Sequence, residues 1–137
     1  MNYCQDGIDI YDGTVTQHCV HNCTYAPIYG HYELQPFDVN ERPYFKKGTH
    51  GLWWDRIGDW WIGSDGSKGQ SYGLAYYTKD VFCPHQLTEW NWVVFDGNYW
   101  KKAGKDLGIS CKYIYVKHNQ IGPTALKFIQ MTTRTTS

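Results

Sequence analysis

The segment GLWWDRIGDWWIGSD, residues 51–65, constrains the fold more than any other part of the sequence. Two Trp-Trp pairs flank a short stretch, Arg56-Ile57-Gly58, that ends in glycine. Glycine readily takes the left-handed conformation that closes three-residue hairpin loops, so we expect two antiparallel strands joined by this stretch. In the resulting register, Trp53 lies opposite Trp61.

Alternation along the two strands sorts their side chains onto two faces. One face carries Leu52, Trp54, Trp60 and Ile62, and the other carries Trp53, Asp55, Asp59 and Trp61. We expect the first set to be buried in the core. The second set places two indoles beside two carboxylates, which lie opposite each other and would repel unless a cation such as Arg56 lies between them.

Indoles beside carboxylates form a surface that sugars favour, because the C–H face of a sugar ring stacks on the aromatic ring while its hydroxyls donate to the acids. The candidate ligand-binding residues are therefore Trp53, Trp61, Asp55, Asp59 and Arg56. The alternative is that another part of the chain covers this face. Trp53 and Trp61 would then form a second buried layer.

Composition favours an all-β fold. Seven Trp, twelve Tyr and five Phe outnumber Leu, Ile and Val, and fourteen Gly and five Pro are scattered along the chain. Aromatics suit pleated surfaces, and scattered turn residues produce short segments. We expect a small antiparallel sandwich or partly open barrel of about seven or eight short strands, with a disulfide-stapled amino-terminal segment.

Further strand candidates lie on both sides of the hairpin. They are a short strand flanked by turns within DGIDIYDG, and the segments GHYELQP, NERPYFKK, YGLAYYT, EWNWVVF and ISCKYIYVK. The chain of 137 residues is long enough for one core, so we expect a single β domain. Within it, residues 1–29 form a Cys-rich segment, residues 30–116 the core module and residues 117–137 an extension.

Charge argues against several partners. Thirteen basic and thirteen acidic residues are mixed along the chain, which predicts no nucleic-acid partner. No stretch approaches the roughly 18 apolar residues of a membrane span. The first residues lack the basic and then apolar pattern of a signal peptide, so either the protein is cytosolic or its leader is missing from this sequence.

The motif HCVHNC, residues 18–23, allows three interpretations. His and Cys are ligands that zinc prefers, but four ligands within six residues strain one another, whereas structural zinc sites usually join two distant pairs. Asn22 begins an N-x-Thr glycosylation signal, and five cysteines in a short chain suit an oxidising compartment. We expect a secreted protein, without metal or other cofactor.

The amino-terminal cysteines are Cys4, Cys19 and Cys23, among which only one pair can form. We expect Cys4 to pair with Cys19 or with Cys23. The remaining thiol would be free or would join two chains. Five reduced cysteines in a cytosolic protein are the alternative.

The run from Gly30 to Cys111 resembles an extracellular module that recurs in proteins of marine invertebrates and protists. The resemblance rests on the following elements: GHYEL, NERPYFKK, LWW, the Trp60-x-Ile62 pair, Cys83-Pro84, Trp90, the Gly97-x-x-Trp100 unit and Ile109-Ser110-Cys111. It implies a secreted β domain with a Cys83–Cys111 disulfide and no known activity. Such a link contributes about 3 kcal/mol in the loop-closure model. The chain departs from the module at Glu41, where glycine is usual, so a tight turn after Asn40 is not predicted.

Function is expected to lie in binding. The sequence contains no nucleophile elbow, zinc-protease motif or phosphate-binding loop. A glycan-binding or adhesion module, with carbohydrate or an extracellular protein as partner, fits an aromatic-rich β scaffold best. One alternative is a structural matrix or assembly protein forming homo-oligomers. A second is a glycosidase with Asp55 and Asp59 as its carboxylate pair.

Overall fold

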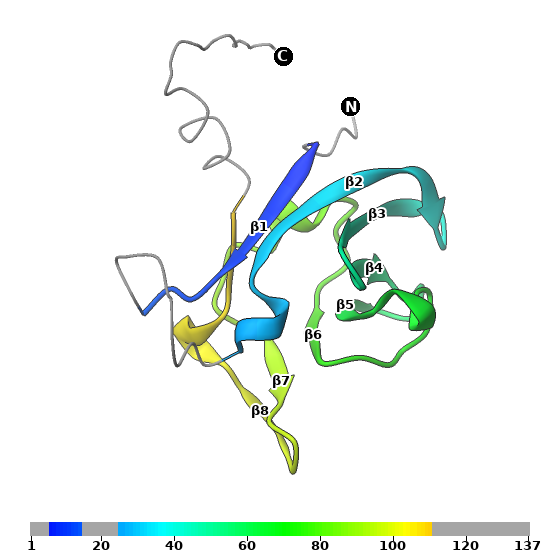
Figure 1. The fold of residues 1–137 in the computed structure, drawn as a ribbon. Coiled ribbons are helices and arrows are strands. Elements are labelled where there is room, and N and C mark those ends of the chain that lie inside the picture. Colours follow the sequence, from blue (N-terminus) through cyan, green and yellow to red (C-terminus); the bar gives the residue numbers. More distant parts are fainter. Residues whose placement is uncertain (1–5, 15–24, 111–137) are drawn as a thin grey trace, which may run out of the picture.

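The computed structural model describes residues 6–14 and 25–110, which form one antiparallel β-sheet (Figure 1). Its nine strands are β1 (Gly7–Tyr11), β2 (Gly30–Val39), β3 (Arg42–Lys47), β4 (His50–Trp54), β5 (Asp59–Ser64), β6 (Ala75–Thr78), β7 (Val93–Phe95), β8 (Trp100–Lys102) and β9 (Gly108–Ser110). Four 3-10 turns connect them: η1 (Ala26–Ile28), η2 (Asp65–Ser67), η3 (Pro84–Gln86) and η4 (Gly104–Asp106). The all-β prediction is confirmed.

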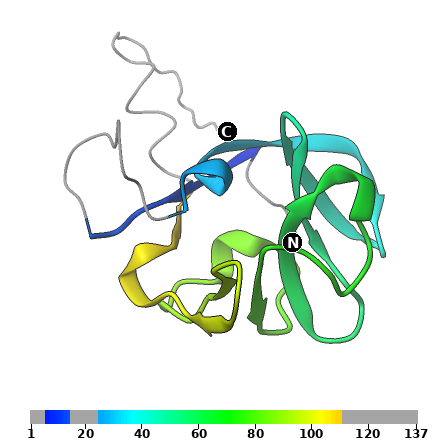
Figure 2. The same ribbon diagram turned by 60° about the horizontal axis from the view of Figure 1, so that its bottom comes forward.

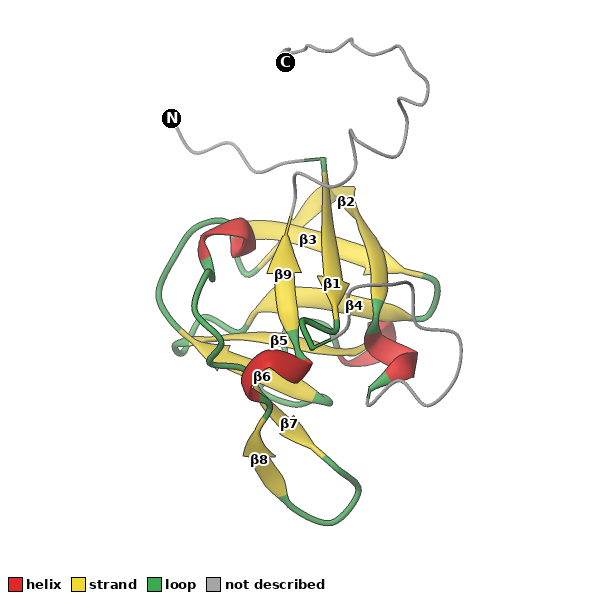
Figure 3. Ribbon diagram, turned by 90° about the vertical axis from the view of Figure 1, so that its left-hand side faces the viewer, coloured by secondary structure: helices red, strands yellow, loops and turns green. Residues whose placement is uncertain are grey.

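The sheet is a meander in which each strand from β1 to β8 pairs with the next one along the chain. The chain then returns, and β9 pairs with β1 at the other end of the sheet. The sheet curls into an open half-barrel, from which the β7–β8 hairpin projects (Figures 1 and 3). Of the two architectures expected from the sequence, the partly open barrel is therefore correct, whereas the expected seven or eight strands are too few, because the described residues form nine.

The concave side of this sheet encloses the main core. Five residues that pair across neighbouring strands form one continuous row on this side: Phe45, Leu52, Ile62, Ala75 and Val94. All five side chains are at most 1% exposed. Because residues of one face alternate with those of the other, this buried row also fixes which side chains point outward.

The predicted tryptophan hairpin forms between β4 and β5 in the expected register, with Trp53 opposite Trp61 and Trp54 opposite Trp60. Its loop differs in one respect. Arg56, with φ of 73°, takes the left-handed conformation, whereas Gly58 has φ of 158° and is nearly extended. The expectation that Gly58 holds the left-handed position is therefore wrong.

A second tight turn joins β2 to β3. Val39 pairs with Arg42, so only Asn40 and Glu41 lie between the strands, with φ of 53° and 69°. A two-residue hairpin loop of type I′ requires positive φ at both loop residues, and glycine is the usual residue at the second position. The turn thus forms although Glu41 occupies the position where glycine is favoured.

Several expectations concern residues that the structure does not describe. HCVHNC, the glycosylation signal at Asn22, the amino-terminal cysteines and Cys111 all lie outside the described residues. Their disulfide pairing and modification therefore stay predictions. Among residues 6–14 and 25–110, no helix has the length and apolar character needed to cross a bilayer.

Candidate functional site

Trp53 and Trp61 lie together on the outer face of the sheet, as the alternation predicts, but they are not exposed. Trp53 is 0% and Trp61 is 7% exposed, and both pack with Tyr44 in a second buried cluster. The expectation that the two indoles form an open sugar platform is therefore wrong. Of the two alternatives that the sequence left open, the second buried layer is the correct one.

The cover over this cluster comes from the connection between β5 and β6, residues 65–74, green in Figure 2. The Trp53 indole N–H donates to the carbonyl of Gln70 at 2.9 Å, and the Tyr44 hydroxyl donates to Asp65. A Cβ at Gly63 would lie 2.8 Å from the Cα of Gly73, so two glycines allow the segment to pack directly on β5. No covering role was assigned to this segment from the sequence.

Asp55 is the structural centre of the hairpin. Its Oδ1 accepts the backbone N–H groups of Ile57, Gly58 and Asp59 at 2.8 to 3.0 Å. Its Oδ2 accepts the indole N–H of Trp61 at 2.9 Å and the Ser71 hydroxyl at 2.8 Å. The carboxylate is 5% exposed and accepts five hydrogen bonds from within the protein, so it has little acceptor capacity left for a sugar.

Burial alone would raise the pKa of Asp55, because it penalises the charged form. The hydrogen bonds from Asp59, Gly58, Trp61 and Ser71 outweigh that effect and hold the pKa below its ordinary value. Asp55 is therefore a charged structural anchor at neutral pH. This role also removes it from a glycosidase pair, which needs a carboxyl group free to reach the substrate.

The other two candidate polar residues do remain at the surface. Asp59 accepts a hydrogen bond from the Thr78 hydroxyl of the neighbouring strand at 2.6 Å. Arg56 is exposed and forms no ion pair with Asp55 or Asp59. The expectation that Arg56 lies between the two carboxylates is wrong, because hydrogen bonds already compensate Asp55.

The outer side of the sheet does carry exposed aromatic residues, farther toward β8. We call Trp61, Tyr76, Phe95 and Trp100 the aromatic face. The Trp100 ring lies 6.0 Å from Trp61, 5.3 Å from Tyr76 and 5.3 Å from Phe95 between ring centroids. Trp100 is 44% and Phe95 is 38% exposed, so this cluster presents open aromatic surface.

Strand register explains why these side chains meet. Trp61 pairs with Tyr76, Tyr76 pairs with Val93, and Phe95, two residues farther along β7, pairs with Trp100. Strand β7 ends at Phe95, and the following turn is held by Asp96 Oδ1, which accepts the backbone N–H groups of Asn98 and Tyr99. The sequence did not indicate that β6 and the β7–β8 hairpin would continue the sheet beside Trp61, so Tyr76, Phe95 and Trp100 were not among the predicted site residues.

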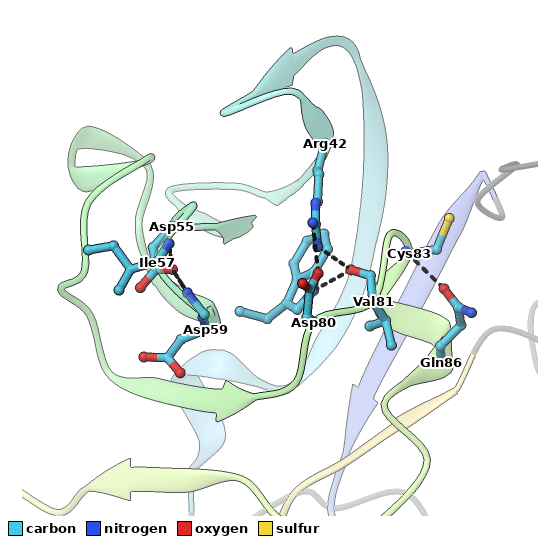
Figure 4. A network of polar contacts seen from close by, with 10 residues as sticks. Arg42, Asp55, Ile57, Asp59, Asp80, Val81, Cys83 and Gln86 are labelled. Carbon is cyan, nitrogen blue, oxygen red and sulfur yellow. Dashed lines mark hydrogen bonds and ion pairs between the residues drawn. The ribbon is translucent and has the colours of Figure 1, made fainter.

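A surface pocket of about 640 Å³ lies at the hairpin end of the sheet, and we call it the hairpin-end pocket. Its lining includes Asn40, Glu41, Arg42, Arg56, Ile57 and Lys79. Figure 4 shows Arg42 reaching toward Asp80 and Val81, while Asp55, Ile57 and Asp59 lie on the hairpin at the other side.

Arg42 is fully engaged within this pocket. Its guanidinium pairs with Asp80 at 2.8 Å, donates to the carbonyl of Val81 at 2.8 Å and lies over the Trp54 ring, 3.8 Å from its centroid. Lys79 pairs with Glu89 at 3.2 Å. A planar guanidinium that stacks on a ring and donates to two separate acceptors is fixed in position, and this combination suits arginine.

A titratable pair lies elsewhere, between β1 and β2. His31 Nδ1 and Asp9 Oδ1 are 2.8 Å apart, and the buried Oδ2 of Asp9 has no hydrogen-bond partner. Within residues 6–14 and 25–110, no group of three His, Cys, Asp or Glu side chains is placed to hold a metal ion. The pair does not therefore extend into a metal centre among those residues.

No family model matches the sequence, and no curated protein and no solved structure matches it either. The resemblance to an extracellular module therefore stays a prediction.

Proposed function

We propose that this chain is an extracellular glycan-binding or adhesion module whose sugar platform is the aromatic face. The observation that carries the proposal is the position of Trp100. It is 44% exposed, yet three aromatic rings of the same face hold it in place. The platform thus shares only Trp61 with the pair Trp53 and Trp61 that the sequence suggested, and its open rings are Phe95 and Trp100.

The chemistry of this face suits a sugar. The C–H side of a pyranose ring stacks on an open aromatic ring, and a ring already fixed by its neighbours loses little conformational entropy on binding. Hydroxyls need polar partners nearby. Thr78 lies two residues from Tyr76 on β6, Asp59 lies two residues from Trp61 on β5, and both are on the same side as those rings. Lys102 shares the side of Trp100 on β8.

Extracellular location is supported by the cysteines and by the glycosylation signal at Asn22. Cys83 is 2% exposed, and five cysteines in a chain of this length suit an oxidising compartment. The resemblance implies Cys111 as its partner. Non-reducing peptide mapping of the purified protein tests that pairing directly.

The proposal is tested on a glycan array with wild-type protein, Trp100→Ala and Tyr72→Ala. Tyr72 is 66% exposed and lies outside the aromatic face, so it controls for the loss of any surface aromatic. We expect Trp100→Ala to lose at least about tenfold in affinity, as stacking contacts of roughly 1.4 kcal/mol imply. Wild-type protein that binds no glycan, or Trp100→Ala that binds as well as wild type, overturns the proposal.

An assembly function has one observation in its favour. Phe95 and Trp100 are in ring contact and both exposed, Tyr99 beside Trp100 in sequence is 75% exposed, and exposed aromatic surface of this kind also marks protein–protein contacts. Light scattering separates the two functions. A dimer that Trp100→Ala dissociates, in a protein without sugar affinity, favours assembly.

A further inference from the structure

Backbone strain in this protein is concentrated around the hairpin-end pocket. Asn40, Glu41 and Arg56 are the three non-glycine residues with positive φ in the described part of the chain. All three line this pocket, although they come from two different hairpins. Strained conformations persist where the surrounding structure enforces them, and they gather at binding sites.

The loop that carries Arg56 is held rigidly. Three backbone N–H groups of residues 57–59 converge on one oxygen of Asp55, whose other oxygen is held by Trp61 and Ser71. The Arg56 side chain itself is exposed and has no hydrogen bond or ion pair among the described residues. The hairpin therefore presents an uncompensated guanidinium from a pre-organised loop.

The charged residues that line the pocket are compatible with binding of an anion. Five charged residues line it: Glu41, Arg42, Arg56, Lys79 and Asp80. Arg42 is already neutralised by Asp80, and Lys79 by Glu89. Arg56 and Glu41 remain, so the pocket offers one cation for an anionic group and one carboxylate that accepts hydroxyl donors.

We propose that the hairpin-end pocket binds the anionic group of an acidic glycan, with Arg56 pairing with a carboxylate or sulfate and Glu41 accepting a sugar hydroxyl. This inference rests on the proposed glycan-binding function and names its ligand class. Ile57, which is 81% exposed and also lines the pocket, supplies apolar surface for the sugar ring.

The pocket and the aromatic face are close enough for one ligand. Tyr76 belongs to the aromatic face and Thr78 lines the pocket, two residues farther along β6. Side chains at i and i+2 of a strand point to the same side, about 7 Å apart. Thr78, which pairs with Asp59, therefore places the pocket beside the Tyr76 end of the aromatic face.

The experiment uses two matched pairs of ligands and calorimetry at low and high salt. One pair is an oligouronate and its carboxyl-reduced counterpart, and the other is a sulfated neutral oligosaccharide and its desulfated counterpart. Arg56→Gly is the test variant, because glycine adopts positive φ freely and the loop keeps its shape. Lys105→Gln, which removes one positive charge from η4, is the control for net charge.

We expect wild type and Lys105→Gln to bind an acidic ligand at least about tenfold more tightly than its neutral counterpart, with a preference that weakens at high salt. Arg56→Gly should lose that preference and keep the affinity for the neutral ligand. Preference for the uronate or for the sulfate identifies the anion.

Equal binding of acidic and neutral ligands, or an unchanged preference in Arg56→Gly, overturns the pocket assignment. Loss of binding in Trp100→Ala would in that case still support the aromatic face. No binding of any ligand overturns both.

Discussion

The indole N–H of Trp61 donates a hydrogen bond to Asp55 Oδ2 at 2.9 Å, across the hairpin that the two residues share. Both residues were expected to bind a ligand, and instead they bind each other. The contact closes the outer face of β4 and β5 and fixes the loop that presents Arg56. The closed outer face and the position of Arg56 thus depend on the same carboxylate.

Replacing Asp55 should therefore destabilise the fold strongly. In Asp55→Asn, an amide group replaces the charged acceptor, and its NH2 faces the donors of Trp61 and Ser71. We expect a loss of about 3 kcal/mol in the free energy of unfolding, because buried donors lose their partner. Urea denaturation measures this loss. Asp59→Asn is the control and should stay within about 0.5 kcal/mol of wild type, since Asp59 lies nearer the surface.

Acid should destabilise the protein through the same group. The pKa of Asp55 is lowered in the folded state, as is that of Asp65, which accepts the Tyr44 hydroxyl. The unfolded chain then binds protons at a higher pH than the folded one, so the stabilisation is complete above about pH 4 and is lost as the pH falls through the lowered pKa values. Denaturation at several pH values should show this fall, with a shallower slope in Asp55→Asn.

The cover over Trp53 should depend on Gly63. A Cβ there would meet the Cα of Gly73 at 2.8 Å and the Trp53 ring at 3.1 Å, so Gly63→Ala must displace residues 65–74. We expect a loss of about 1 to 3 kcal/mol and a red shift of the tryptophan emission. Gly66→Ala, whose Cβ has an ordinary 3.7 Å contact in the same segment, should change neither quantity. A Gly63→Ala protein as stable as wild type contradicts this account.

Quenching of tryptophan fluorescence should separate the exposed indoles from the buried ones. Trp100 is 44% exposed and Trp90 is 37%, whereas Trp53, Trp60 and Trp92 are 0% exposed. We expect Trp100→Phe to lower acrylamide quenching clearly, because it removes the most exposed indole. Trp53→Phe should leave the quenchable fraction unchanged or increase it. A larger drop in acrylamide quenching for Trp53→Phe than for Trp100→Phe would contradict the exposure of these two indoles in the structure.

Relief of backbone strain should stabilise the two turns beside the pocket. We expect Glu41→Gly and Arg56→Gly each to raise the free energy of unfolding by about 0.5 to 1 kcal/mol, because glycine relieves the positive φ at a smaller cost in chain entropy. Gly48→Ala is the reverse control. Its φ is 57° and its surroundings are open, so the substitution should destabilise through φ alone. Thermal unfolding of the three variants measures the comparison.

The sequence by itself determined the local structure. A three-residue loop and the period of two along each strand sufficed to place Trp53 opposite Trp61 and to assign Trp54 and Trp60 to the core. These features depend on residues within one hairpin, where the turn sets the register and the register sets the faces. The all-β class followed for the same reason, because turn residues and aromatic strands recur along the whole chain.

Only the tertiary structure decided which face meets solvent. A segment rich in Gly and Ser, residues 65–74, covers Trp53, although nothing in its own sequence distinguishes it from an exposed loop. Strand neighbours from farther along the chain bring Tyr76, Phe95 and Trp100 beside Trp61. Burial depends on contacts between segments that are distant in the sequence. A local pattern of apolar and polar residues shows which side chains share a face, but it does not show which other segment covers that face.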